Sequence, residues 1–83
     1  NMKKVNPEVG IRYRVSGGYL YVSGIEPTTP AQISIFEKTG TLICNKQVFS
    51  ETESSVNVAD FASGIYLLRV QSSDYCWVTK FVK

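Results

Sequence analysis

The fold of this 83-residue chain is decided by the stretch Asp60-Phe61-Ala62-Ser63-Gly64-Ile65-Tyr66. In immunoglobulin-like β-sandwiches, a tyrosine near the start of the sixth strand donates its hydroxyl hydrogen bond to the backbone a few residues upstream and fixes the turn between the sheets. Tyr66 is placed for this bond, with Phe61 as an apolar plug and Gly64 to allow a tight approach of the backbone. The stretch therefore predicts a structural corner made by Phe61, Gly64 and Tyr66. A half-buried strand tyrosine without the upstream bond is the alternative interpretation.

On both sides of the corner, apolar and polar residues alternate with a period of two, and no window shows the spacing of a surface helix. Short runs of β-branched and aromatic residues are separated by turn residues, which predicts strands. The seven predicted strands cover residues 11–15, 19–23, 31–37, 41–49, 56–59, 64–71 and 75–82. Short strands with a turn every ~8–12 residues are typical of a Greek-key sandwich. The predicted fold class is therefore an all-β, immunoglobulin-like, seven-stranded Greek-key β-sandwich.

The connections between the strands carry their own signals. Gly17-Gly18 predicts a two-residue hairpin, because glycine readily adopts the positive φ that such a turn needs. Pro27 and Pro30 lack the N–H that a central strand uses, so we expect this segment outside the sheets. The polar residues 50–55 are expected to form a loop that crosses between the sheets. The length leaves room for one domain, residues 11–83, preceded by a linker or N-terminal extension at residues 1–10.

The last two predicted strands carry apolar residues on both faces. In residues 64–71, Ile65 and Leu67 lie on one face, and Tyr66, Leu68 and Val70 lie on the other. Burial of one face in the core cannot account for both rows. We therefore expect the second row to pack on a neighbouring domain or subunit, or to meet a partner during function. A homodimer formed through these edge strands is one version of this expectation.

The composition is that of a globular domain, with 43% hydrophobic and 12% aromatic residues. The longest apolar stretch is only a few residues, so no segment is expected to insert into a membrane. Met2-Lys3-Lys4 is followed by polar residues rather than by the apolar segment of a secretory signal. We therefore expect either a cytosolic protein or a mature or excised piece of a longer precursor.

The charge distribution argues against nucleic acid as a partner. The net charge is +2, and the Lys and Arg residues are scattered rather than clustered where they could neutralise adjacent phosphates. Arg12-Tyr13-Arg14 alternates basic and aromatic side chains, as a stacking surface for bases would. The outward face of an ordinary strand is the simpler interpretation of that pattern.

The sequence lacks the residues that most catalytic and cofactor sites require. The chain has no histidine, which excludes a Ser-His or Cys-His nucleophile within it. The seven carboxylates are dispersed, and only Glu51 and Glu53 are near neighbours, in a polar segment where we expect them to be solvated. No helix is predicted that a phosphate-binding loop could open. The sequence therefore predicts no enzyme activity and no cofactor.

The two cysteines, Cys44 and Cys76, could form a disulfide if the protein is exported. A metal site normally needs closer pairs and usually histidine, so metal binding is not predicted. The alternative is that both residues are free thiols that behave as small hydrophobic side chains.

Four segments together resemble a known family. Residues 56–70, which include the corner, resemble the hallmark segment of the type IX secretion (Por secretion system) C-terminal sorting domains of the Bacteroidetes. Residues 33–43 are similar to the family's strand-turn-strand with a glycine at the turn, and Asn6-Pro7 is similar to its opening Asn-Pro. Residues 80–83 are similar to its lysine-bearing terminal strand. Together these segments span nearly the whole chain.

The resemblance implies a non-catalytic sorting signal that directs an exported protein through the bacterial outer membrane. The implied partners are the outer-membrane translocon, which would recognise the domain in the periplasm, and a sortase that would remove it and attach the cargo to surface lipopolysaccharide. The implied localisation runs from the periplasm to the cell surface or the medium. Translocon recognition maps to Lys80, Phe81, Val82 and Lys83.

Strand addition gives this recognition a physical basis. A terminal edge strand offers unpaired backbone N–H and C=O groups to a partner strand. Lys80 and Lys83 would add complementary charge, although lysines also protect a sheet edge from aggregation without any partner. The alternative function is a small secreted immunoglobulin-like structural or adhesion domain.

Overall fold

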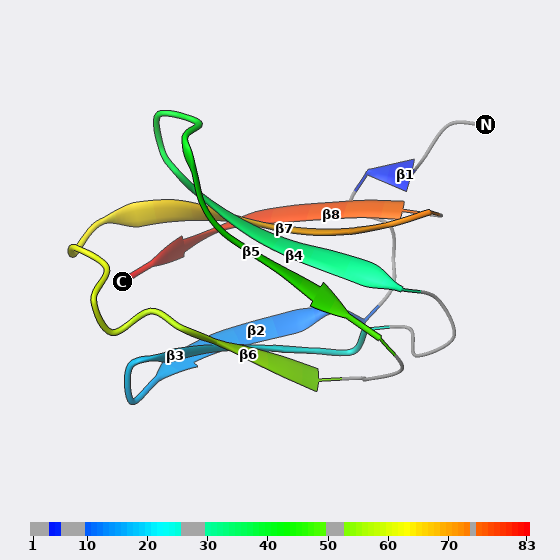
Figure 1. The fold of residues 1–83 in the computed structure, drawn as a ribbon, viewed down its shortest axis with the longest axis horizontal. Helices are drawn as coiled ribbons and strands as arrows, with labels where there is room; N and C mark the ends of the chain where they lie inside the picture. Colours follow the sequence, from blue (N-terminus) through cyan, green and yellow to red (C-terminus); the bar gives the residue numbers. More distant parts are fainter. Residues whose placement is uncertain (1–3, 6–9, 26–29, 50–52, 74) are drawn as a thin grey trace.

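Two β-sheets packed face to face form the part of the chain that the computed structural model describes, residues 4–5, 10–25, 30–49, 53–73 and 75–83 (Figure 1). The larger sheet has five strands in the order β1 (Lys4–Val5), β8 (Tyr75–Val82), β7 (Ile65–Ser72), β4 (Ala31–Glu37) and β5 (Leu42–Val48). The smaller sheet has three strands in the order β2 (Arg12–Ser16), β3 (Tyr19–Ser23) and β6 (Glu53–Asn57). No helix occurs among these described residues, and the predicted all-β sandwich is confirmed.

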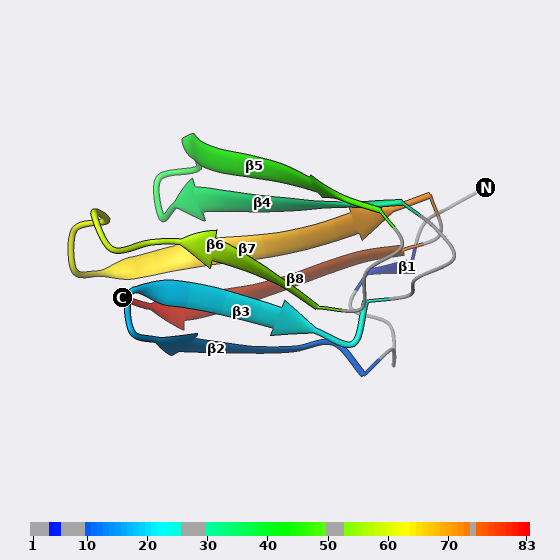
Figure 2. The same cartoon turned by 60° about the horizontal axis from the view of Figure 1, so that its bottom comes forward.

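The chain passes between the two sheets four times, after β1, after β3, after β5 and after β6. The strands of both sheets run along the length of the molecule, with β2 and β3 facing the larger sheet (Figure 2). Within each sheet the described pairs are antiparallel, except for β1, which adds to β8 in parallel. The hairpin predicted at Gly17-Gly18 joins β2 to β3, with φ values of 59° and 83° that suit a two-residue turn.

Three segments differ from the sequence prediction. Residues 58–59, predicted at the end of a strand, follow β6 and belong to the corner. Residues 53–55, expected in a crossing loop, belong to β6, where Ser54 pairs with Val22 and Ser55 with Tyr21. Their polar side chains hide the strand signal, although Ser54 occupies an inward position and is buried. β1 was not predicted either, because two residues are too short to show a period. The predicted features at Asn6-Pro7, residues 27–29 and residues 50–52 lie outside the described residues.

The core lies between the two sheets and is built from alternate side chains of each strand. Cross-strand register places Ile33, Val70 and Trp77 in one inward row, and Ile35, Leu68 and Thr79 in the next. Trp77 and Cys44 are partly buried and pack against this core. The fully buried apolar side chains of the core are Leu20, Val22, Ile25, Ile33, Ile35, Val48, Val58, Leu68 and Val70.

Each sheet also has an outer face, made by the side chains that alternate with the core rows. The register assigns to the outer face of the larger sheet Gln32, Ser34, Phe36, Leu42, Asn45, Gln47, Ile65, Leu67, Arg69, Gln71, Cys76, Val78, Lys80 and Val82. It assigns to the outer face of the smaller sheet Arg12, Arg14, Ser16, Tyr19, Tyr21, Ser23, Glu53, Ser55 and Asn57. Apolar side chains therefore line both faces of β7 and β8, but only the inner face of the smaller sheet.

Candidate functional site at the end of the last strand

The corner between β6 and β7 holds Tyr66 in a buried position, 7% exposed. Its hydroxyl donates a hydrogen bond of 2.6 Å to the carbonyl oxygen of Ala62, four residues upstream. The Phe61 ring lies 5.3 Å from the Tyr66 ring, and the Phe61 N–H donates to the Val58 carbonyl at 3.0 Å. The loop is thereby tied at both ends as it crosses from the smaller sheet to the larger one (Figure 1).

Gly64 serves this corner for a different reason than the tight approach that the sequence suggested. A Cβ atom at this position would meet nothing within 4 Å, so there is room for a side chain. The backbone φ is 155°, a value that residues with a side chain rarely adopt. The glycine is therefore explained by its backbone conformation, and the interpretation as a close approach is wrong.

Phe81 anchors the end of β8 to the same corner. Its side chain is 2% exposed and stacks on Tyr66, with ring centroids 5.6 Å apart and an interplanar angle of 25°. The Tyr66 ring thus contacts both Phe61 and Phe81. In the folded domain the Phe81 side chain is inaccessible to a partner, so its part in any recognition is to fix the residues on either side of it.

Lys83 is bound to the corner by its backbone and its side chain. Its N–H donates to the Gly64 carbonyl at 2.9 Å, and its own carbonyl accepts from the Gly64 N–H at 3.3 Å. Its Nζ donates to the Phe61 carbonyl at 3.3 Å in a partly buried contact. The structure therefore brings together the predicted corner and the predicted recognition residues, which the sequence had treated as separate features.

Lys80 and Val82 are the accessible members of the predicted recognition set. Both side chains are exposed, Val82 to 69%. Because Gly64 and Lys83 exchange two backbone hydrogen bonds, the antiparallel alternation turns the backbone groups of Lys80 and Val82 away from β7, toward the outer edge of β8. β1 covers this edge only at Tyr75 and Cys76.

Tyr13 also reaches this edge. Its hydroxyl donates 2.9 Å to the Lys80 carbonyl, and its ring meets the Trp77 ring edge-on with centroids 6.2 Å apart. The smaller sheet therefore closes over the middle of β8. Sequence reasoning missed this contact, because alternation places Tyr13 on the inward row without showing which strand of the other sheet it meets.

Cys44 and Cys76 are both free thiols. They lie on β5 and β8, with β4 and β7 between them in the sheet. Three strand spacings of about 4.8 Å put them at least about 14 Å apart, and Cys44 is level with Thr79 rather than with Cys76, so the pair is well beyond the reach of a disulfide. The bridge that the sequence left open is thus incompatible with this fold.

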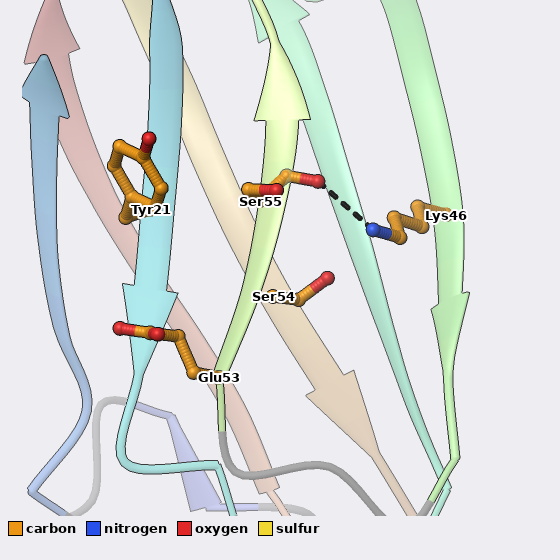
Figure 3. A pocket seen from close by; sticks show the side chains of 5 residues that line it. All are labelled: Tyr21, Lys46, Glu53, Ser54 and Ser55. Atoms are coloured by element: carbon orange, nitrogen blue, oxygen red, sulfur yellow. Dashed lines mark hydrogen bonds between the residues drawn. The ribbon is translucent and has the colours of Figure 1, made fainter.

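A small hollow of about 180 Å³ lies between the edges of the two sheets and is lined by Tyr21, Lys46, Glu53, Ser54 and Ser55 (Figure 3). Lys46 extends from β5 and donates 2.9 Å to the Ser55 carbonyl on β6, whereas the Glu53 carboxylate points away from it. An inward lysine on an edge strand discourages pairing with further strands. The arrangement offers no acid–base pair and is explained as protection of two open edges.

Other kinds of site were sought in the part of the chain that the structure describes. No group of three or more Cys, Asp or Glu side chains is placed there to hold a metal ion. Over the same residues, there is no helix of the length and apolar character needed to cross a bilayer.

The fold is that of an immunoglobulin-like β-sandwich. The structure is similar to the crystal structure of a DUF3244 family protein with this fold from Bacteroides vulgatus, with a TM-score of 0.78 over 88% of this chain and 82% of the other. The sequence identity is 17%, so this likeness concerns the fold alone. No curated protein matches the chain.

The family is defined by the sequence. Residues 16–83 match the model of the secretion system C-terminal sorting domain, and the chain belongs to this family. The predicted resemblance is thereby confirmed. Membership implies a C-terminal secretion sorting signal on an exported protein. Both the family and the fold are typically non-catalytic.

Proposed function

We propose that this domain directs an exported bacterial protein through the outer membrane without any catalysis of its own. We propose further that the translocon recognises the strand end formed by Lys80, Phe81, Val82 and Lys83, with buried Phe81 fixing the position of the other three. A sortase then removes the domain, and the cargo is attached to the cell surface. Family membership supports the sorting role. The choice of residues is supported by the end of β8, where anchored residues alternate with exposed ones.

This alternation of anchored and exposed residues at the end of β8 is the observation that carries the proposal. Phe81 is buried against Tyr66 and Lys83 is bonded to Gly64 and Phe61, so the strand end has a fixed position. Between these two anchors, Val82 presents a side chain that is 69% exposed. A fixed strand with an accessible edge suits recognition by strand addition, because little conformational entropy is lost when a partner pairs with it.

The test must separate recognition from stability. Deletion of residues 81–83 would remove the Phe81 anchor and destabilise the fold, so loss of secretion alone would be ambiguous. The double variant Lys80→Glu/Val82→Glu changes only exposed side chains. In the full-length protein we expect this variant to accumulate in the periplasm, while the isolated domain keeps its unfolding midpoint in urea.

The matched control is Lys38→Glu, which makes the same lysine-to-glutamate charge reversal at an exposed turn between β4 and β5. We expect this control to reach the cell surface at the normal level. Normal surface delivery of the Lys80→Glu/Val82→Glu variant would refute the assignment of recognition to these residues, whereas equal failure of both variants would point to a general effect of charge.

A further inference from the structure

A second candidate binding surface lies on the outer face of the larger sheet. We call it the Arg69 surface, and it consists of Phe36, Leu42, Ile65, Leu67, Arg69 and Lys80. One cross-strand row places Lys80, Leu67, Phe36 and Leu42 side by side across four strands. Leu42 and Ile65 are 49% and 48% exposed. Contiguous exposed apolar side chains of this kind mark interaction sites, whereas single ones do not.

Arg69 is held in place at the centre of this surface. Its guanidinium lies over the Phe36 ring, 4.9 Å from the centroid. Its Nε is buried and has no hydrogen-bond partner, and the same is true of the hydroxyl of Ser34, its register neighbour on β4. Because both atoms are shielded from solvent, a partner cannot bond to them in this conformation, and the partly exposed Arg69 side chain is what this surface offers.

The charge of this face is one-sided. Its charged side chains among the described residues are Arg69 and Lys80, and none is acidic. Lys80 lies opposite Leu67, so it is a diagonal neighbour of Arg69, with Cβ atoms about 7–8 Å apart. The guanidinium lies toward Phe36 on β4, on the other side of β7 from Lys80, so the flexible Lys80 side chain has to extend across Leu67 for both cations to meet one carboxylate.

We propose that the Arg69 surface binds a protein segment in which apolar side chains flank a single Asp or Glu, whose carboxylate pairs with Arg69 and Lys80. The planar fork of a guanidinium suits a carboxylate, and stacking on an aromatic ring preorganises it for this contact. The two proposals share Lys80, but this binding requires only the folded domain and not the secretion machinery.

Charge complementarity also decides between this occupant and two others. A second copy of the chain would bring Arg69 and Lys80 against the same two cations, with no carboxylate on the described part of the face to pair with them. An anionic membrane is normally bound by a cluster of basic residues, and this face has two. A carboxylate-bearing protein segment satisfies both the apolar row and the cations.

The test is a binding titration with a defined probe. Acetyl-Val-Leu-Asp-Leu-Val-amide is added to the isotope-labelled full chain, and amide chemical shifts are followed by NMR. We expect saturable shifts on β4, β7 and β8 at about millimolar peptide. Replacing Asp by Asn in the peptide, or Arg69→Gln in the protein, should weaken binding about tenfold. Arg12→Gln, on the outer face of the smaller sheet, is the matched control and should leave the affinity unchanged.

Several results would overturn the proposal. Equal affinity for the Asp and Asn peptides, or equal affinity of wild type and Arg69→Gln for the Asp peptide, would refute the proposed contact between the carboxylate and Arg69. The absence of saturable shifts would refute the assignment of the Arg69 surface as a binding site for such a segment. Arg69-dependent binding to vesicles of phosphatidylglycerol and phosphatidylcholine, without peptide binding, would assign the face to a membrane. A dimer in sedimentation that Arg69→Gln dissociates would assign it to self-association. The binding test does not measure secretion of the full-length protein. A negative result for peptide binding therefore leaves the sorting proposal intact.

Discussion

The outer faces of the two sheets differ in a way that their inner faces do not. On the smaller sheet, the outer row is polar and aromatic, with the Arg14 guanidinium 4.2 Å from the centroid of the Tyr21 ring and Glu53 on the neighbouring strand. On the larger sheet, the outer row next to Arg69, which runs from Leu42 through Phe36 and Leu67 to Lys80, is apolar and basic. The outer face of the smaller sheet is typical of a sheet with one face in water. The outer face of the larger sheet still exposes apolar side chains that a partner could bury. The inner faces of both sheets hold the fold together, whereas the outer face of the larger sheet remains available to partners.

The largest expected effect tests the inner face of β8. Phe81→Ala removes a 2% exposed aromatic ring that packs on Tyr66, so we expect it to destabilise the domain by about 3–5 kcal/mol. Val82→Ala, one residue further on the outer face, should change stability by less than about 0.5 kcal/mol. Urea unfolding of both variants measures the contrast. A small loss for Phe81→Ala would mean that the end of β8 is not anchored to the corner.

A smaller effect is expected at the corner hydroxyl. Tyr66→Phe keeps the stacked ring but removes the 2.6 Å bond to the Ala62 carbonyl, which should cost about 1 kcal/mol. Tyr19→Phe, at an exposed position on the outer face of the smaller sheet, makes the same chemical change and should be close to neutral. Unfolding midpoints of the two variants provide the measurement. Equal midpoints would show that the corner is held by ring packing alone.

Much of this corner could be predicted from the sequence because its signals are local. Phe61, Gly64 and Tyr66 lie within six consecutive residues, and β4 was placed at residues 31–37 by simple alternation between turn residues. Alternation also separates buried Phe81 from exposed Lys80 and Val82 once the strand is known.

The remaining features depend on contacts between distant parts of the chain. β6 was missed at residues 53–55 because Ser54 fills an inward position near a sheet edge, where a polar residue is tolerated. The bond from Lys83 Nζ to the Phe61 carbonyl and the bond from Tyr13 to Lys80 join residues that only the packing of the sheets brings together. Likewise, the wide separation of Cys44 from Cys76 follows from strand order, which periodicity does not show.

Tyr13→Phe tests whether the smaller sheet closes over β8. The variant keeps the edge-on contact with Trp77 and removes the bond to the Lys80 carbonyl, which lies at an exposed position. We expect a loss of about 0.5 kcal/mol, at the low end for a hydrogen bond because water can replace the hydroxyl. Urea unfolding gives the loss, and Tyr19→Phe again serves as the control. Identical stability of the two variants would mean that the Tyr13 bond contributes nothing to the closure of β2 on β8.

The smallest expected change in stability is also the one that bears most directly on the two outer faces. The double variant Leu42→Thr/Ile65→Thr removes two half-exposed apolar side chains from the Arg69 surface and keeps good strand formers in their place. If this face is free in the isolated domain, stability should stay within about 0.5 kcal/mol of wild type, since surface substitutions rarely do more. Binding of the Asp peptide should nevertheless fall severalfold, because the apolar row that flanks the carboxylate is lost. Urea unfolding and the NMR titration, made on the same preparation, separate the two outcomes. A loss of more than about 1 kcal/mol would show that the row is already buried within the chain, and the contrast between the two outer faces would then reflect internal packing rather than a surface kept for a partner.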